Sequence, residues 1–411
     1  MNQFIWSNSS KIDAIAFAAD PSLPTGSQQS NANHRRNFNM LQEIRSLVLD
    51  GSSFQMRPGG PIAIRLLEGE TGEILECATA GSSGTPKIIR RSHRSWIASF
   101  EVNAKLFGLL STDTYAVFGS LEHSLSLYGV LEAAHIGANL CMLAGLRPDT
   151  QLELLAEKGV TTLYATPTQL EALVSAGGQG LGFEKIKRIF IGGGACSMAL
   201  AEKCRAFFTS ADLYPFYGAS ETSFITMANA NTPDGSVGMA YPNVEISIRN
   251  GTGQVTNGTG EIWVRSPYLF TGYVEQIESD TKHQDGFVTV GEFGQLDEAG
   301  NLIIKGRKSR MVTVADQNVF PDETEQFLSK YFAAGPLAVV PVPDDKRGHR
   351  LAVVIVDEAN KPELESAIDL CRKTLGMHGT PKYIFVAKHL PQLVSGKLDY
   401  SKITAWAEDQ L

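Results

Sequence analysis

Residues 79–87, Thr-Ala-Gly-Ser-Ser-Gly-Thr-Pro-Lys, are of types that can surround a chain of phosphates. Small residues let backbone N–H groups turn inward, and hydroxyls and one lysine can add further donors. The segment is not a Walker loop, because GxxxxGK[ST] is absent. A stretch of glycine and serine is also typical of an ordinary connecting loop, so this segment alone leaves phosphate binding and a flexible joint as alternatives.

Further along the chain, three segments present charged side chains suited to a nucleotide. FYGASET (216–222) contains Glu221, which could offer one carboxylate to a metal–nucleotide complex. In residues 290–307, Glu292 could accept hydrogen bonds from ribose hydroxyls and Arg307 could bind phosphate or ribose. Near the C-terminus, SGK places Lys397 on a turn. Each also has a simpler explanation as a solvated charge on a turn or hairpin.

The order of these segments is more informative than any one of them. TAGSSGTPK, YGASE, GEIWVR, GEFG followed by GR, NVFPDETE and SGK follow one another between about residues 60 and 405. Together they resemble the adenylate-forming superfamily, which contains acyl- and aryl-CoA synthetases, nonribosomal adenylation domains and luciferases. Shorter segments such as ATPTQLEAL and IGGGACS occur at the corresponding places between them.

The resemblance implies a reaction in two steps. A carboxylate attacks the α-phosphate of ATP, pyrophosphate leaves, and the acyl-adenylate passes to a thiol of CoA or of a phosphopantetheine carrier protein. Because an anion must approach a polyanion, we expect catalysis by positioning and by charge neutralisation, with Mg²⁺ as the metal. The alternatives are an enzyme that stops at the adenylate, and an inactive relative that binds a nucleotide or acyl ligand as a regulator.

The resemblance also assigns roles to individual residues. The phosphate loop is expected to use Thr79, Ser82, Ser83, Gly84, Thr85 and Lys87. The adenine slot is expected at Gly192, Gly193, Gly194, Tyr217, Gly218 and Ser220. Glu221 would bind Mg²⁺, Glu292 the ribose, Arg307 ribose or phosphate, and Lys397 the reacting carboxylate and α-phosphate. The acid pocket is expected to involve His123, Tyr128, Tyr164, Ala219 and Phe224, with Gly193 also near it, and these side chains favour an aryl or short acid.

Several positions depart from the superfamily pattern. Glu292 stands where aspartate is usual, and Ser309 occupies the hinge position, usually aspartate or lysine. Asp316 replaces a glycine that would lie near the pantetheine arm, where it adds bulk and negative charge. The phosphate loop begins at residue 79, so much of the first subdomain is expected to be missing. A homodimer could then cover an exposed sheet edge.

The elements that must position these residues alternate between strands and helices. KRIFIGGG followed by MALAEKCRAFF, and TTLYATP followed by TQLEALVSAG, each read as strand, turn and helix, which indicates a largely parallel sheet. From residue 242 the turns become closer, as in an antiparallel region or small barrel. We predict a helix over 37–51 and a loop over 21–37.

These patterns predict an α/β protein. Residues 1–307 would form a large domain of helix-covered mixed sheets with a small β-barrel-like region, and residues 308–411 a small mobile α+β domain. In that superfamily the small domain rotates about the hinge between the two reaction steps.

The composition restricts partners and location. The chain has 411 residues and a formal net charge of −8, which argues against nucleic acid or an anionic membrane as the main partner. No CxxC pair occurs among the five cysteines, which indicates neither a zinc site nor a disulfide framework and favours the cytoplasm. No secretory signal is apparent, and no apolar stretch approaches the ~20 residues of a membrane span.

Overall fold

The computed structural model describes residues 3–7, 12–13, 28–57, 64–67, 69, 73–79, 87–177, 183–275, 279–332, 335–392 and 398–411. These residues form two compact units. The first contains residues 1–81, 85–245 and 264–278, and the second consists mainly of residues 246–263 and 279–411.

The centre of the first unit is an eight-stranded sheet. In spatial order its strands are β1 (Ile12–Asp13), β7 (Asn139–Met142), β6 (Thr114–Val117), β8 (Thr162–Ala165), β9 (Arg188–Ile191), β10 (Asp212–Ala219), β11 (Ser223–Met227) and β12 (Met239–Ala240). In this spatial order the strands from β1 through β10 are parallel to their neighbours, whereas β11 and β12 are added by antiparallel pairing. The predicted alternation of strand and helix is confirmed.

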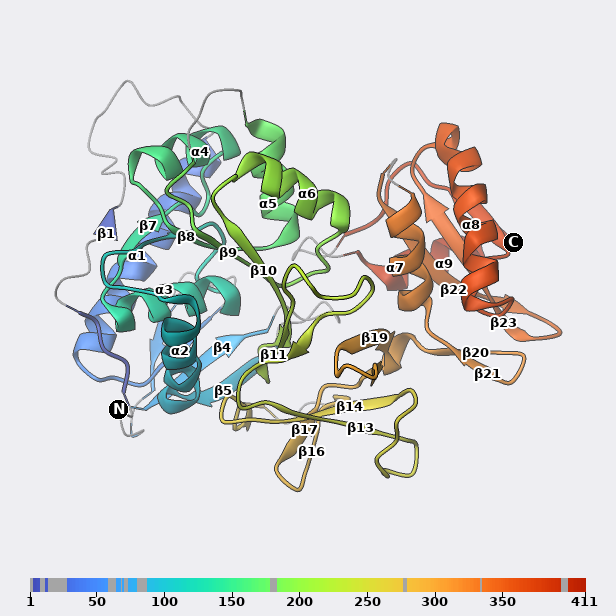
Figure 1. The fold of residues 1–411 in the computed structure, drawn as a ribbon, viewed down its shortest axis with the longest axis horizontal. Coiled ribbons are helices and arrows are strands. Elements are labelled where there is room, and N and C mark those ends of the chain that lie inside the picture. Colours follow the sequence, from blue (N-terminus) through green and yellow to red (C-terminus); the bar gives the residue numbers. More distant parts are fainter. Residues whose placement is uncertain are drawn as a thin grey trace. The chain divides into compact units, whose positions relative to one another are not determined.

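Helices surround this sheet in Figure 1. They are α1 (Gln28–Leu49), α2 (His93–Phe107), α3 (Ser124–Ile136), α4 (Pro148–Glu157), α5 (Pro167–Ala176) and α6 (Met198–Phe207). Local sequence explains two of the starts. Thr166 and Gln169 form a capping box at α5, and the Ser197 side chain accepts the Leu200 N–H at α6. Apolar side chains of α4, α5 and α6 and of the central strands form one core cluster.

The N-terminal region differs from the prediction. Residues 28–36 were expected in a loop but belong to α1, and polar side chains of this helix have partners across the fold. His34 Nδ1 lies 3.0 Å from the Ala144 carbonyl, and Asn37 Oδ1 accepts the Leu121 N–H at 3.0 Å. Strand β1 pairs with β7. Strand β1 is therefore the edge strand of this sheet, and the homodimer stays a prediction.

A second sheet of the first unit holds the ends of the predicted phosphate loop. Its spatial order is β15 (Gly272–Tyr273), β5 (Ile88–Ser92), β4 (Ile74–Ala78), β2 (Phe54–Met56) and β3 (Ile64–Leu66). Strands β4 and β5 are antiparallel neighbours, so the segment between them connects the two arms of a hairpin.

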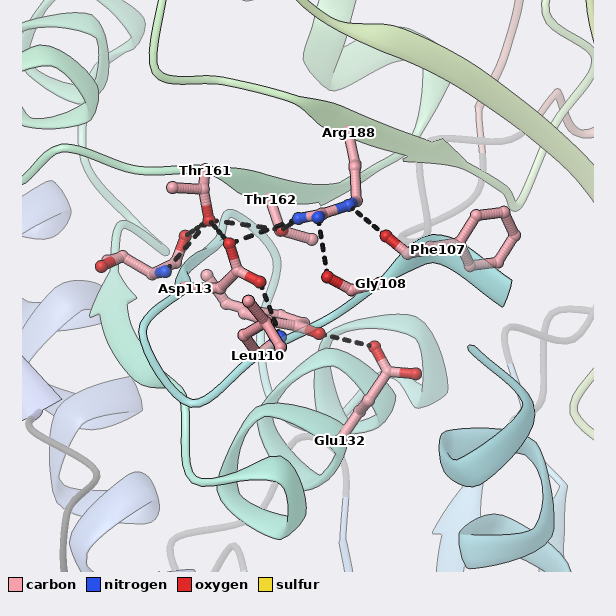
Figure 2. A network of polar contacts seen from close by, with 10 residues as sticks. Phe107, Gly108, Leu110, Asp113, Glu132, Thr161, Thr162 and Arg188 are labelled. Carbon is pink, nitrogen blue, oxygen red and sulfur yellow. Dashed lines mark hydrogen bonds and ion pairs between the residues drawn. The ribbon is translucent and has the colours of Figure 1, made fainter. Parts of the chain in front are cut away.

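A polar network fixes the amino ends of the parallel strands, as Figure 2 shows. Arg188 donates to the carbonyls of Phe107 and Gly108 at 2.7 and 2.9 Å and pairs with Asp113 at 3.3 Å. Thr161 donates to the same carboxylate at 2.8 Å. The opposite, carboxyl ends of parallel strands are where α/β proteins bind ligands.

The second unit contains two further sheets. One comprises β16 (Lys282–Gln284), β17 (Phe287–Thr289), β14 (Gly260–Arg265), β18 (Glu292–Leu296) and β19 (Leu302–Arg307), with β13 (Glu245–Arg249) beside β14. The other comprises β21 (Gln317–Val319), β20 (Val312–Val314), β23 (Gly348–Ile355) and β22 (Leu337–Asp344), with β24 (Tyr383–Val386) beside β23. Its helical segments are η1 (Lys308–Arg310), α7 (Pro321–Tyr331), η2 (Glu358–Asn360), α8 (Lys361–Leu375) and α9 (Tyr400–Glu408).

The predicted α/β class, with mixed sheets and a small α+β C-terminal part, is confirmed. The β14-containing sheet groups with the C-terminal residues in one compact unit, and the predicted domain boundary after residue 307 stays a prediction. Within the described part of the chain, no helix combines the length and apolar character needed to cross a membrane.

Candidate active site

The two ends of the predicted phosphate loop are joined by a backbone hydrogen bond. The Thr79 N–H, directly after β4, donates to the Lys87 carbonyl, directly before β5, at 2.8 Å. The hairpin register therefore places the loop at one end of the second sheet. The intervening candidates Ser82, Ser83, Gly84 and Thr85 lie outside the described residues, so their predicted role stays a prediction.

Lys87 and Glu221, which are far apart in the sequence, both contact Tyr273. The Lys87 Nζ lies 5.5 Å from the centre of the Tyr273 ring, and the Tyr273 hydroxyl donates to Glu221 Oε1 at 2.7 Å. Strand β15 carries Tyr273 beside β5, with Tyr273 opposite Ile89. The Phe270 N–H also donates to the Glu221 carbonyl at 2.8 Å. A lysine and a carboxylate are thus held around one tyrosine.

Tyr273 is a site residue that the sequence analysis missed. Its signal is the Thr-Gly-Tyr sequence at 271–273, a short strand that follows the GEIWVR strand. Only the pairing of β15 with β5 shows that this tyrosine lies beside the phosphate loop, because 181 residues separate Arg90 from its partner Thr271.

The carboxylate of Glu221 fits a magnesium ion that is bound mainly through phosphates. Among the described residues, no group of three or more His, Cys, Asp or Glu side chains is placed to hold a metal by itself. Mg²⁺ commonly uses one or two protein carboxylates together with substrate phosphates and waters. A single buried carboxylate, oriented by a tyrosine hydroxyl, matches that requirement.

The glycines of the expected adenine slot follow β9 at the carboxyl end of the parallel sheet. The Gly192 N–H donates to the Ala165 carbonyl at 3.2 Å, and Gly193 has a φ of +80°. A Cβ at Gly192 would lie 2.2 Å from Cζ of Phe216, so a side chain there would displace the β10 aromatic ring. Gly193 and Gly194 are exposed.

The YGASE segment is shaped by a bulge in the β10–β11 hairpin. The register shifts between Tyr217 and Gly218, and a Cβ at Gly218 would lie 1.9 Å from the Ser223 carbonyl oxygen. The Ala219 N–H donates to the Thr222 hydroxyl at 3.1 Å. The bulge therefore requires glycine and directs the turn that carries Glu221.

His123 lies close to this turn and to the phosphate loop. It is exposed, precedes α3, and forms an isolated parallel bridge with Ala78 at the end of β4. Its neighbour Ser124 hydrogen-bonds through its hydroxyl to Ser220 at 2.9 Å. Its exposure shows that His123 is not a buried core histidine.

Three aromatic pocket candidates are buried in the core. Tyr128 donates to the Ser99 hydroxyl at 2.9 Å, and Tyr164 donates to Glu132 at 2.7 Å. The Phe224 ring packs edge-on against Tyr128 at 5.2 Å. Their role in binding the acid stays a prediction.

Glu132 itself is a buried carboxylate surrounded by neutral donors. It accepts hydrogen bonds from Asn103, Tyr164 and Tyr115 at 2.7, 2.7 and 3.2 Å. Burial raises the pKa of Glu132 to about 7, although these hydrogen bonds act in the opposite direction. The sequence analysis did not identify this group.

In the second unit, Glu292 and Arg307 face each other across β18 and β19. Arg307 Nε donates to Glu292 Oε1 at 3.2 Å, and the Arg307 N–H donates to the Asp322 carboxylate at 3.2 Å. The two side chains predicted to bind ribose and phosphate therefore pair with each other within one sheet. Lys397 lies outside the described residues.

The hinge candidate Ser309 and Asp316 both follow the last strand of this sheet closely in the sequence. Ser309 is exposed in the short helix η1. Ala315 and Asp316 have φ values of 47° and 66° and form the two-residue turn between β20 and β21. A left-handed conformation explains why glycine suits this position, and aspartate is one of the residues that tolerate it.

Comparisons with known proteins agree with this arrangement. Residues 77–274 match the family model described as "AMP-binding enzyme", and residues 323–397 match the model of the "AMP-binding enzyme C-terminal domain". An uncharacterized acyl–CoA ligase of Bacillus subtilis, YhfT, is 33% identical over 338 residues, which are 81% of this chain and 68% of the relative.

Solved structures share the fold. An amide bond synthetase, McbA of Marinactinospora thermotolerans, matches with a TM-score of 0.71 at 24% identity, over 85% of this chain and 72% of that one. The o-succinylbenzoate CoA synthetase of Bacillus subtilis, in complex with its acyl-adenylate intermediate, matches with a TM-score of 0.70 at 24% identity, over 84% and 72%.

Proposed function

The chain belongs to the AMP-binding enzyme family, within the adenylate-forming superfamily, and we propose that it activates an aryl or short carboxylic acid. The acid attacks the α-phosphate of ATP, an acyl-adenylate forms, and pyrophosphate leaves. The acyl group then passes to the thiol of CoA. The enzyme is thus an AMP-forming acid–thiol ligase that uses ATP, Mg²⁺ and CoA.

The observation that supports this proposal best is the contact of both Lys87 and Glu221 with Tyr273. A triphosphate beside Tyr273 would meet the Lys87 ammonium group over the tyrosine ring and the Glu221 carboxylate at the tyrosine hydroxyl. Mg²⁺, when bound, would reduce the negative charge that opposes the approach of the acid. The Tyr273 hydroxyl holds the carboxylate in place before the ligand arrives.

The remaining roles follow from the resemblance. Glu292 would accept hydrogen bonds from the ribose, and Arg307, now paired with Glu292, would share that contact. Lys397 would neutralise the carboxylate and α-phosphate oxygens as they meet. His123, which is exposed and bridges to Ala78 at the end of β4, would lie at the mouth of the acid pocket.

A carrier protein is the alternative acceptor, because exposed Asp316 adds negative charge where the pantetheine arm is expected. We also propose a cytoplasmic location, since the five cysteines are all free thiols.

ATP–pyrophosphate exchange across a panel of acids, with and without CoA, tests the proposal. We expect exchange with an aryl or short acid, thioester when CoA is added, and a loss of about a hundredfold or more in Lys397→Ala. Exchange without thioester would favour a carrier protein. No exchange with any acid would favour the inactive binder, and undiminished exchange in Lys397→Ala would contradict the role of that lysine.

Tyr273→Phe tests the site geometry directly. Losing one hydrogen bond to a carboxylate costs about 1.5–3 kcal/mol, so we expect exchange to slow by tenfold or more and the Mg²⁺ requirement to rise. Tyr214→Phe is the matched control, since its hydroxyl contacts only Asp212 among the described residues. Equal pyrophosphate-exchange rates in wild type and Tyr273→Phe would contradict the proposed metal site.

A further inference from the structure

Arg91 is a buried cation for which the described residues provide no carboxylate partner. It lies in β5 and is 2% exposed. Its guanidinium stacks on Trp96 at 4.3 Å and donates to the Ser95 hydroxyl and carbonyl at 3.2 and 3.1 Å. Both hydrogen-bond acceptors are neutral, and among the described residues the charge of Glu221 acts on Arg91 without a direct ion pair.

The preceding residue shows how the same strand balances a charge. Arg90 points to the other face of the sheet and pairs with the buried Glu76 at 2.7 Å, and Gln55 donates to that carboxylate at 2.6 Å. Burying a charge costs several kcal/mol unless it is paired. Arg91 is therefore the exception in β5, and its charge calls for a different explanation.

The side on which Arg91 lies is that of the proposed phosphate site. Side chains alternate along a strand, so Ile89 and Arg91 share one face, and Lys87 precedes them at the same spacing. Tyr273, which lies opposite Ile89 in the register, is held by Lys87 and holds Glu221. Burial lowers the pKa of Arg91 to about 10, which leaves it charged at neutral pH, while interactions with Cys77, Tyr128 and Glu221 act in the opposite direction.

We propose that Arg91 is a fixed counter-charge for the polyphosphate of the nucleotide and for pyrophosphate, acting from beneath the site without contacting the ligand. This inference rests on the proposed function. Arg91 is a positioning residue: its charge lowers the electrostatic cost of holding several phosphates beside Glu221. A charge acting at this range through a poorly polarisable medium can change binding by about tenfold.

The role predicts different effects on the two half-reactions. The adenylation step involves the triphosphate and pyrophosphate, whereas thioester formation from a supplied acyl-adenylate involves neither. We expect Arg91→Met, which keeps an unbranched chain over Trp96, to raise the KM for ATP about tenfold and to slow pyrophosphate exchange. Thioester formation from supplied acyl-adenylate should stay within about twofold of wild type, and Arg91→Lys should restore much of the ATP affinity.

Arg90→Met is the matched control, because it removes a cation from the other face and leaves Glu76 unpaired. It should lower the unfolding temperature more than Arg91→Met and leave the ratio of the two half-reaction rates unchanged. If Arg91→Met slows both half-reactions equally, or changes neither, Arg91 has only a structural role. The proposal is also overturned if Arg91→Lys is no better than Arg91→Met.

Calorimetric binding of MgATP and of pyrophosphate separates this inference from the proposed function. If Arg91→Met binds both ligands more weakly than the wild type, and the wild type catalyses pyrophosphate exchange with no acid, the counter-charge is supported and the ligase activity is contradicted. If Arg91→Met binds both ligands as tightly as the wild type, and the wild type does catalyse exchange, only the counter-charge is contradicted.

Discussion

Single side chains in this protein are held by few but specific contacts. Glu221 is fixed by one tyrosine hydroxyl, whereas Glu132 is surrounded by an amide and several hydroxyls. We propose that the first group meets a ligand, whereas the second is fully buried. Two carboxylates in one unit therefore meet different demands.

Glu132 should make stability depend on pH. Its pKa in the folded protein is about 7, against 4.5 for the free side chain, so the folded state binds the extra proton between these values. Stability from this group is complete below pH 4.5 and falls as the pH rises to about 7. As the pH rises over that range, we expect the unfolding free energy of the wild type to fall by about 1–3 kcal/mol relative to that of Glu132→Gln.

Denaturant unfolding at several pH values would measure this difference. His93 titrates in the same range with the opposite sign, because burial lowers its pKa to about 4, but it is present in both proteins and cancels. A difference that does not change with pH would show that Glu132 is ionised in the folded protein throughout.

At the scale of elements, local patterns predicted the strand–turn–helix units well. Strands β8 and β9 with helices α5 and α6 lie where the sequence placed them, because proline, glycine and capping side chains determine their ends. Helix α1 was predicted from residue 37, but its start could not be placed correctly, since contacts of His34 and Asn37 with residues 144 and 121 lie far away in the sequence. Tyr273 was missed for the same reason, because pairing over a long sequence distance leaves no local pattern.

The turn between β20 and β21 allows a prediction at this scale. Asp316 is held at φ 66°, which costs a non-glycine residue on the order of 1 kcal/mol. We expect Asp316→Gly to stabilise the protein by up to about 1 kcal/mol and to lower the KM for CoA severalfold, because bulk and negative charge leave the turn.

Thermal unfolding and steady-state kinetics with CoA would test this, with Asp316→Asn as the control that keeps the bulk and removes the charge. Pyrophosphate exchange should not change. A KM for CoA that is unaffected in both variants would show that this turn does not lie near the pantetheine arm.

For the whole molecule, the proposed reaction needs one chain to carry out two steps, and the hinge prediction at Ser309 follows from that need. Proline would fix φ at this exposed position and push Lys308 toward an extended backbone. We expect Ser309→Pro to slow overall thioester synthesis about tenfold while at least one half-reaction, assayed alone, keeps nearly the wild-type rate.

Rapid-quench measurement of adenylate formation, beside conversion of supplied acyl-adenylate, would test it, with Ser309→Ala as the control. Parallel losses in both half-reactions would point to damaged folding, and an unchanged overall rate would place the hinge elsewhere.

The pairing of β1 with β7 has a consequence for the order in which the chain is made. Ile12 leaves the ribosome 128 residues before its partner Leu140, the difference between their positions. Helix α1 waits similarly for the carbonyl of Ala144. Strand β1 thus cannot join the central sheet until β7 has been made, and contacts over such distances form slowly. A ribosome paused shortly before residue 139 would hold a chain whose first strand has no partner.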